Sequence, residues 1–140
     1  ISACLVGSEM CIRDRIQEGS VWEAAMAAKH HELGNLKVIL DCNRIQNDDF
    51  CDTQMRMFDI PAKWRSFGWD VKEIDGHNME EIVAGLDFLV GNDSNPAILI
   101  AHTVKGKGVS YMEDNPAFHG AAPNDEQFDI AMVELGEVHS

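Results

Sequence analysis

Apolar and polar positions follow one another in blocks that predict short buried strands separated by helices. Short apolar runs at Leu36–Leu40 and Ala97–Ala101 are typical of strands covered on both faces. The segment Trp69–Ile74 alternates apolar and polar residues, as a half-buried strand does. Over Met79–Val90 the apolar residues recur about every 3.6 positions, which predicts a helix that Asn78 can cap.

Residues at the ends of the other blocks predict where two more helices begin and end. Ser20 and Glu23 have the spacing of a capping box, which predicts a helix start, and Gly34 is a plausible stop for that helix. Pro61 can open a second helix, which Gly68 ends. These signals predict from the sequence alone where each of the two helices begins and ends.

With a last helix at Asn124–Leu135, the predicted order is helix–strand–helix–strand–helix–strand–helix. Buried strands that alternate with helices indicate an α/β fold, here a partial doubly wound parallel sheet. Such sheets bind ligands in the loops that follow the carboxyl ends of their strands. Those loops are Asp41–Thr53, Asp75–Asn78 and His102–Pro123, and we expect most of the chemistry in the first and third.

The composition removes several function classes. The 140 residues include 11 Lys and Arg against 24 Asp and Glu, a formal net charge of −13, which argues against nucleic-acid and anionic-membrane partners. No apolar run reaches the roughly 20 residues of a membrane span. The four cysteines lack metal-site spacing, so reduced thiols and a cytoplasmic location are expected.

Candidate chemistry near the first strand consists of an amide, a carbonyl and two acids. Asn43 offers a side-chain oxygen that suits Mg²⁺, and the backbone carbonyl of Ile45 can be a second ligand. The alternative is that Asn43 only caps a turn. Glu18 and Glu23 stand together at a helix start, where helix capping and the helix dipole also favour acids.

The third loop has the composition of an anion site. Lys105 and Lys107 stand beside glycines, which let backbone amides approach an anion, although the spacing is not that of a phosphate-binding P-loop. His119 is a candidate proton-transfer group or phosphate contact. The alternative for His119 is an ordinary loop histidine without a chemical role.

Three ordered blocks of the chain resemble the thiamine-diphosphate domain of transketolases. They are QEGSVWEAAMAAKHHELGNLKVILDCNRIQ, PAKWRSFGWDVKEIDGH and AHTVKGKGVSYMEDNPAFHGAAPNDEQF. The likeness spans residues 17–136 and is strongest to the amino-terminal subunit of split, two-subunit transketolases. Phe118-His-Gly120 followed by Ala-Pro-Asn-Asp-Glu126 favours this type over 2-oxo-acid dehydrogenases and deoxyxylulose-phosphate synthases, which use the same cofactor.

The resemblance implies an activity and a cofactor. It implies transfer of a two-carbon ketol unit between sugar phosphates, with thiamine diphosphate and Mg²⁺ as cofactors. Asn43 and Ile45 match the second and third metal ligands of the family. Glu18 and Glu23 match two glutamates at the subunit interface that link paired active sites, and His119 matches a histidine near the diphosphate and the reacting carbon.

The resemblance also implies partners and a larger protein. The expected partner is a carboxyl-terminal transketolase subunit that carries the pyrimidine domain, within an oligomer. Because the chain begins with Ile1, we expect a piece of a longer subunit. Residues 16–140 are then the carboxyl-terminal half of the domain, and residues 1–15 are a segment outside the family pattern.

The match fails at the first metal ligand. The Gly-Asp-Gly motif of the family should occupy residues 12–14, where this chain has Ile12, Arg13 and Asp14. A cation at the position of the metal aspartate opposes a dication, so we expect very weak binding of Mg²⁺ and thiamine diphosphate by this chain. A non-catalytic fragment is therefore the alternative to an active transketolase subunit.

Overall fold

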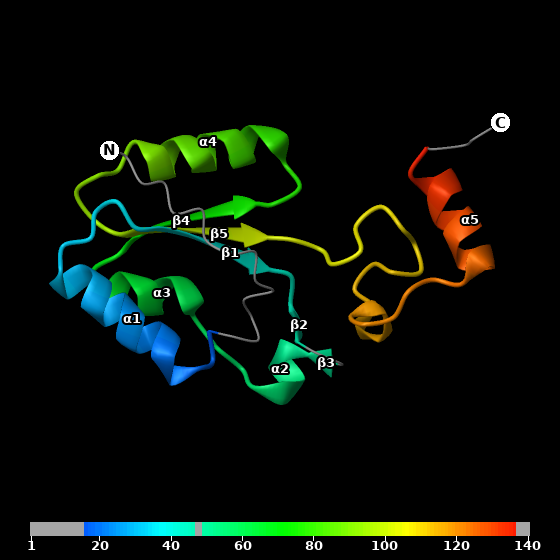
Figure 1. Cartoon of the computed structure of the whole chain (residues 1–140), viewed down its shortest axis with the longest axis horizontal. Coiled ribbons are helices and arrows are strands. Elements are labelled where there is room, and N and C mark those ends of the chain that lie inside the picture. Colours follow the sequence, from blue (N-terminus) through cyan, green and yellow to red (C-terminus); the bar gives the residue numbers. More distant parts are fainter. Residues whose placement is uncertain (1–15, 47–48, 137–140) are drawn as a thin grey trace.

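The computed structural model describes residues 16–46 and 49–136 and contains a three-stranded parallel sheet (Figure 1). The strands are β1 (Lys37–Cys42), β4 (Asp70–Asp75) and β5 (Ala97–His102), in the spatial order β1-β5-β4. Their carboxyl ends are in register, since Cys42 and Asp75 both lie opposite His102. The predicted α/β fold with a parallel sheet is confirmed.

Helices cover both faces of this sheet, as a doubly wound arrangement requires. Figure 1 shows α1 (Gly19–His30) and α3 (Ile60–Ser66) on one face and α4 (Met79–Val90) on the other. Four consecutive residues of β5, Ala97–Ile100, are buried, because β5 is the central strand and is covered from both sides. Burial from both sides explains why this strand is a continuous apolar run in the sequence.

Most of the core lies between the sheet and helices α1 and α3. The rings of Trp64 and Trp69 lie 4.8 Å apart with their planes at 70°, an edge-to-face pair. Trp22 lies 5.4 Å from Trp64 on the other side. The indole nitrogen of Trp69 donates to the carbonyl of Ala25 at 2.9 Å, which ties α1 to the start of β4. The α4 face has a smaller core around Leu89 and residues of β4 and β5.

The predicted start and stop of the first helix were wrong. The helix begins at Gly19, with Glu18 as an N-cap residue whose side chain makes no capping hydrogen bond, so Ser20 lies inside the helix and no capping box forms. The helix ends at His30, before Gly34. A Cβ atom at Gly34 would lie 2.0 Å from the carbonyl oxygen of Asp93, so this glycine permits a close approach of two loops instead of ending a helix.

The other predicted helix limits were confirmed within a residue or two. Pro61 lies in the first turn of α3, where the N-cap Asp59 accepts from the Ala62 amide at 2.9 Å. Gly68 follows that helix with φ of +82°. Asn78 caps α4 by accepting from two amides of its first turn.

The predicted loops contain short elements that a periodic pattern cannot reveal. The first loop forms a small antiparallel pair, β2 (Ile45–Gln46) with β3 (Asp49–Phe50), followed by α2 (Cys51–Gln54). The third loop contains a single 3₁₀ turn, η1 (Pro116–Phe118). Elements of two to four residues have no period to detect.

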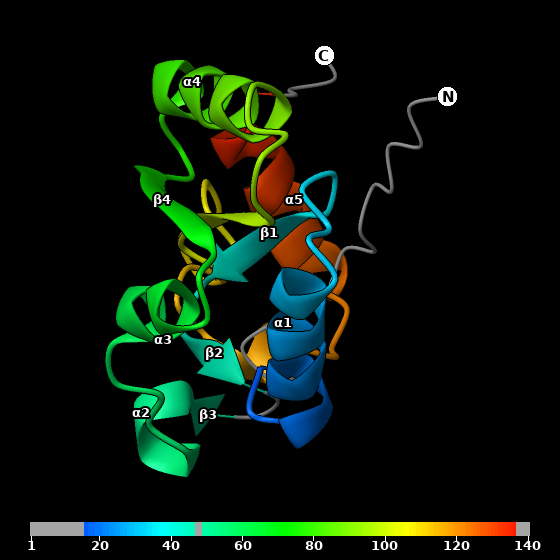
Figure 2. The same ribbon diagram turned by 90° about the vertical axis from the view of Figure 1, so that its left-hand side faces the viewer.

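The last helix, α5 (Asp125–Glu134), stands apart from the sheet in Figure 1, and in the turned view of Figure 2 it lies behind the strands. It begins with a complete capping box, in which Asn124 and Gln127 bond each other's backbone amides. Within the described residues, no helix has the length and apolar character needed to cross a membrane. The segment 1–15, which the resemblance leaves outside the family pattern, lies outside those residues.

Candidate functional site

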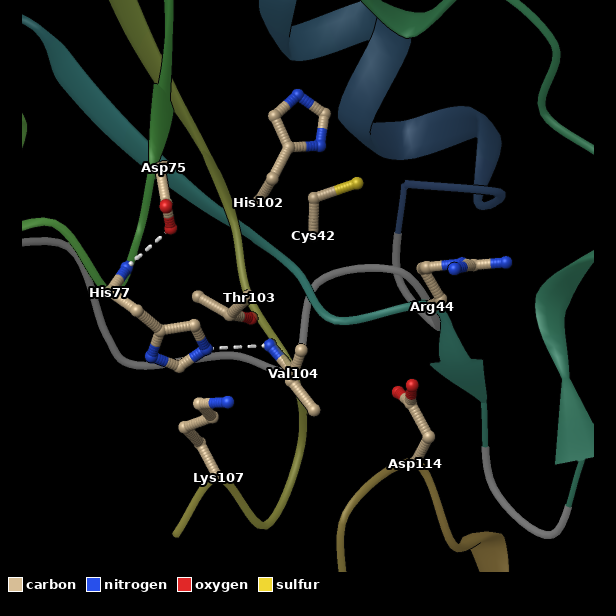
Figure 3. A pocket seen from close by; sticks show the side chains of 9 residues that line it. All are labelled: Cys42, Arg44, Asp75, His77, His102, Thr103, Val104, Lys107 and Asp114. Atoms are coloured by element: carbon tan, nitrogen blue, oxygen red, sulfur yellow. Dashed lines mark hydrogen bonds between the residues drawn. The ribbon is translucent and has the colours of Figure 1, made fainter.

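A cavity opens at the carboxyl ends of all three strands (Figure 3). Its lining comes from the loops after β1, β4 and β5, and consists of Cys42, Arg44, Asp75, His77, His102, Thr103, Val104, Lys107 and Asp114. This is the edge at which doubly wound sheets bind their ligands. The loop after β4 also contributes to the cavity lining, although the sequence pointed mainly to the loops after β1 and β5.

Asn43 lies just below this edge in a network of polar side chains. It is 3 % exposed, and its amide nitrogen donates to the Asp41 carboxylate at 3.0 Å. Its amide oxygen accepts from the Ile45 backbone amide at 3.1 Å, an Asx turn. Asp41 also accepts from the Thr103 hydroxyl, so the end of β1 is joined to the loop after β5. The turn-capping role weighed for Asn43 therefore exists.

The backbone is strained beside Asn43. Arg44 has φ of +69°, in the left-handed region that side chains other than glycine rarely adopt. Its carbonyl accepts from the Cys51 amide at 3.0 Å, which holds the turn closed. Asn43 and Ile45, on either side of this positive φ, are both buried.

The loop after β4 joins the loop after β5 through Gly76 and His77. The Gly76 amide donates to the His102 carbonyl at 2.8 Å, and a Cβ atom at Gly76 would lie 2.4 Å from a methyl group of Thr103. The Val104 amide donates to Nε2 of His77 at 2.7 Å (Figure 3). The sequence pattern predicts only a simple turn for this segment. Its position after a parallel strand was the signal that it belonged to the site.

In the third loop, two of the predicted residues lie together. Nζ of Lys105 is 2.7 Å from Nδ1 of His119, so the ammonium donates and the imidazole nitrogen accepts. The Lys105 carbonyl also accepts from the Asp114 amide at 3.0 Å, which closes the loop at its neck. Lys107 lines the cavity and pairs with Glu113 at 3.4 Å.

Glu18 and Glu23 are exposed at the start of α1, outside the lining of this cavity. The side-chain amides of Gln17 and Gln46 bond each other at 2.9 and 2.6 Å. That pair sets the start of α1 beside β2, next to Ile45. Glu18, next to Gln17 in the chain, therefore lies near the loop that follows β1.

Two glutamates fasten the third loop and α5, and both have lowered pKa values. The Gly108 amide at 3.0 Å is the main cause that lowers the pKa of Glu113, and Lys107 adds to the effect. The hydroxyl and amide of Ser110 lower the pKa of Glu134. Burial and the Glu134 charge raise the pKa of Tyr111. Both glutamates therefore bind the loop in their ionised form.

The groups that the sequence predicts as metal donors are an amide and a carbonyl oxygen. Among residues 16–46 and 49–136, no three His, Cys, Asp or Glu side chains come together as a metal cluster. The Asn43 side-chain oxygen and the Ile45 carbonyl oxygen, both in the turn after β1, are hard oxygen donors by type.

Residues 8–138 match the family model described as "transketolase, thiamine diphosphate binding domain". The matched span begins inside the segment 1–15 that the sequence pattern set apart.

Similar proteins come from bacteria and from animals. The chain is 41 % identical over 120 residues to one of the subunits of the apulose-4-phosphate transketolase from Phocaeicola vulgatus, covering 86 % of this chain and 43 % of that protein. It is 35 % identical over 117 residues to human transketolase, covering 84 % of this chain and 18 % of the human protein.

Solved structures agree with these sequence matches. The crystal structure of Campylobacter jejuni transketolase superposes with a TM-score of 0.80 at 29 % identity, covering 86 % of this chain and 19 % of that one. The chain thus spans less than half the length of the relatives it matches. It belongs to the transketolase family and holds part of that family's thiamine-diphosphate-binding domain.

Proposed function

We propose that the chain is the cofactor-binding part of a transketolase subunit that transfers a two-carbon ketol unit between sugar phosphates, with thiamine diphosphate and Mg²⁺. The observation that carries the proposal is the polar cavity at the edge of the sheet, lined from the ends of all three strands and by Cys42 and Arg44 on either side of buried Asn43, in a chain of the transketolase family. When bound, thiamine diphosphate supplies a carbanion and an electron sink.

Asn43 and Ile45 are the groups of this chain that we assign to Mg²⁺. Asp41 accepts from the amide nitrogen of Asn43, so the nitrogen is turned to Asp41 and the amide oxygen, which accepts from the Ile45 amide, is a hard donor of the type that Mg²⁺ binds. Ile45 is fully buried in the same turn. Both groups fit a magnesium site in type and in position along the turn.

Lys105 and His119 are assigned to the phosphate end of the cofactor. The ammonium of Lys105 supplies positive charge, and the imidazole of His119 holds it in place through the 2.7 Å contact. His119 then has its second ring nitrogen free to donate to an anion or to the reacting centre. Glu18 and Glu23 are assigned to the interface between subunits.

We further propose that the partner is a second, different subunit. Relatives from Phocaeicola vulgatus and Clostridium are named as transketolase subunits, and the chain covers 43 % of each. The missing half of the cofactor site would then come from a carboxyl-terminal subunit with the pyrimidine domain, in a cytoplasmic oligomer. The similar proteins described above are transketolases, which favours this function over a 2-oxo-acid dehydrogenase or a deoxyxylulose-phosphate synthase.

The first metal ligand does not fit in this chain. Where the family has Gly-Asp-Gly, positions 12–14 hold Ile, Arg and Asp, so a carboxylate ligand is replaced by the cation of Arg13. This departure supports the second candidate function, a fragment without catalytic activity. We therefore propose very weak cofactor binding by the 140-residue chain and confine its cause to residues 12–14.

Calorimetric titration with Mg²⁺ and thiamine diphosphate tests both proposals. The matched variant carries Ile12→Gly, Arg13→Asp and Asp14→Gly together, with the rest of the chain unchanged. We expect at least about tenfold tighter binding in the variant, because one charged ligand is gained and one repulsion removed. Asn43→Ala added to the variant should abolish the gain.

Two results would contradict the proposals. Micromolar affinity of the unchanged chain would show that Arg13 does not impair the site. A restored motif without any gain in affinity would show that residues 12–14 do not face the metal.

A further inference from the structure

His77 makes a hydrogen bond that a passive turn residue would not need. Its Nε2 atom accepts from the Val104 backbone amide at 2.7 Å, across 27 residues of sequence. An imidazole nitrogen that accepts carries no proton, so the proton of the neutral ring lies on Nδ1. The His77 amide itself donates to the Asp75 carboxylate at 2.9 Å, which fixes the turn on which the ring is mounted.

The bond acts at the point where the third loop leaves the sheet. Strand β5 ends at His102, and its last backbone contacts are Gly76 to the His102 carbonyl and Thr103 to the Cys42 carbonyl, at 2.8 and 3.4 Å. Beyond Thr103, the amide of Val104 bonds to the His77 ring. His77 thus extends the anchoring of the chain by one residue past the sheet.

The next residue along the chain is Lys105. Its side chain contacts His119, and its carbonyl accepts from Asp114, so its backbone is the neck of the loop. Turns inside the loop, such as Lys107 to Val104 and Val109 to Gly106, bond only loop residues to one another. The direction of the Lys105 side chain relative to the sheet therefore depends on the bond made by its neighbour Val104.

We propose that His77 is a positioning residue that holds Lys105 against His119 by fixing the Val104 amide. This inference rests on the proposed function, which assigns Lys105 and His119 to the phosphate end of the cofactor. His77 does not touch the cofactor in this role. It acts through the backbone, and an acceptor atom at the same place is the only chemical requirement.

Three substitutions separate this role from general loss of structure. His77→Ala removes the acceptor, whereas His77→Gln keeps an oxygen acceptor at a similar distance from the backbone. His102→Ala removes another histidine of the same cavity, whose ring pairs with Glu73 at 3.2 Å and has no bond to Val104. Amide exchange along β5 reports whether each variant keeps the sheet.

The first measurement is hydrogen exchange of the Val104 amide by NMR in the ligand-free chain. We expect about tenfold faster exchange in His77→Ala, since a lost hydrogen bond is worth about 1 kcal/mol or somewhat more. His77→Gln and His102→Ala should stay within about twofold of the unchanged chain, on the same scale. Equal exchange rates in all variants would overturn the proposal, as would His77→Gln behaving like His77→Ala.

The second measurement is the ring nitrogen spectrum of His119, which a merely local role of His77 would not change. In the unchanged chain we expect one dominant tautomer, with the proton on Nε2, because Nδ1 accepts from Lys105. In His77→Ala this pattern should give way to a mixture, and His77→Gln should restore it. Faster exchange at Val104 with an unaltered His119 spectrum would overturn the proposal.

Titration with inorganic pyrophosphate distinguishes this inference from the function on which it rests. We expect loop resonances to respond in the unchanged chain, with a several-fold weaker response in His77→Ala. A loop that ignores pyrophosphate in every variant would contradict the assignment of the diphosphate site, while the two ligand-free measurements still decide the role of His77.

Discussion

The sheet with its three helices and the segment from Thr103 to Glu134 differ in what holds them. Under α1 and α3, three tryptophans pack against one another and against buried residues of β1 and β5. In the segment from Thr103 to Glu134, only Val109 and Ala131 are buried among the described residues. Hydrogen bonds of His77, Asp41, Glu113 and Glu134 attach and fold this segment instead. Apolar burial stabilises the first region, and the second should therefore open locally at lower cost.

The largest effect on this comparison should come from Trp69→Ala. Its side chain is 4 % exposed and bonded to Ala25, so the change leaves a cavity and removes the hydrogen bond to α1. We expect a loss of about 3–5 kcal/mol in the free energy of unfolding, measured in urea. Phe128→Ala on α5, where the ring is 52 % exposed, is the matched control and should cost less than about 1 kcal/mol. Equal losses in the two variants would contradict the comparison.

The next effect should appear where the two regions meet. A Cβ atom added by Gly76→Ala would lie 2.4 Å from the Thr103 methyl and 3.1 Å from the His102 carbonyl, so the third loop must move. We expect a cost of about 1–3 kcal/mol in thermal or urea unfolding. Gly120→Ala is the control in the same loop, because nothing lies within 4 Å of its Cβ position. An unchanged free energy of unfolding in Gly76→Ala would mean that the loops after β4 and β5 are not held in close contact at Gly76.

Much of the sheet region could be predicted from the sequence, because burial leaves recognisable patterns of apolar residues. Helix α4 has a clear period because one of its faces is buried, and strand β5 is a continuous apolar run because both of its faces are buried. The start of α1 was mispredicted because Ser20 and Glu23 fit a capping box that is also compatible with the interior of a helix. Sequence spacing alone does not distinguish the two.

The candidate site was predictable in its place but only partly in its contacts. Parallel strands imply the edge, and residue types pointed to Asn43, Lys105 and His119. The bond between His77 and Val104 joins residues 27 positions apart in different loops, so no local pattern reveals it. The strained Arg44 was equally hidden, because residue type does not disclose a positive φ.

Replacement of Arg44 by glycine tests the cost of the backbone strain after β1. Arginine at φ of +69° costs about 1 kcal/mol relative to a residue without a Cβ atom. Arg44→Gly should therefore stabilise the chain by up to about 1 kcal/mol in urea unfolding. Arg56→Gly, at an exposed position without positive φ, should not stabilise. Destabilisation by Arg44→Gly would indicate that its side-chain contacts outweigh the backbone strain.

The smallest effect should be a loosening of the third loop in acid. Ser110 lowers the pKa of Glu134 below its ordinary value of 4.5, and Gly108 does the same for Glu113. A carboxylate whose pKa is lower in the folded state stabilises that state at pH values above the ordinary pKa. This stabilisation is lost as the pH falls through the folded-state pKa. Amide exchange at Gly108 and Ser110 should therefore rise below pH 4.5 before exchange in β5 does. Glu134→Gln should remove this dependence at Ser110, and unchanged pH dependence in that variant would refute the assignment.

The central claim is that the carboxyl edge of the sheet is the cofactor site, and an NMR titration tests it most directly. Mg²⁺ and thiamine diphosphate are added to the unchanged chain, and the backbone amide resonances are followed, which detects weak binding as well. We predict shifts gathered at Asn43–Ile45 and Val104–Lys105, with little change in α1 and α3. Shifts centred on the tryptophan core under α1, or no shifts at the edge even in the variant with residues 12–14 changed to Gly-Asp-Gly, would contradict the account.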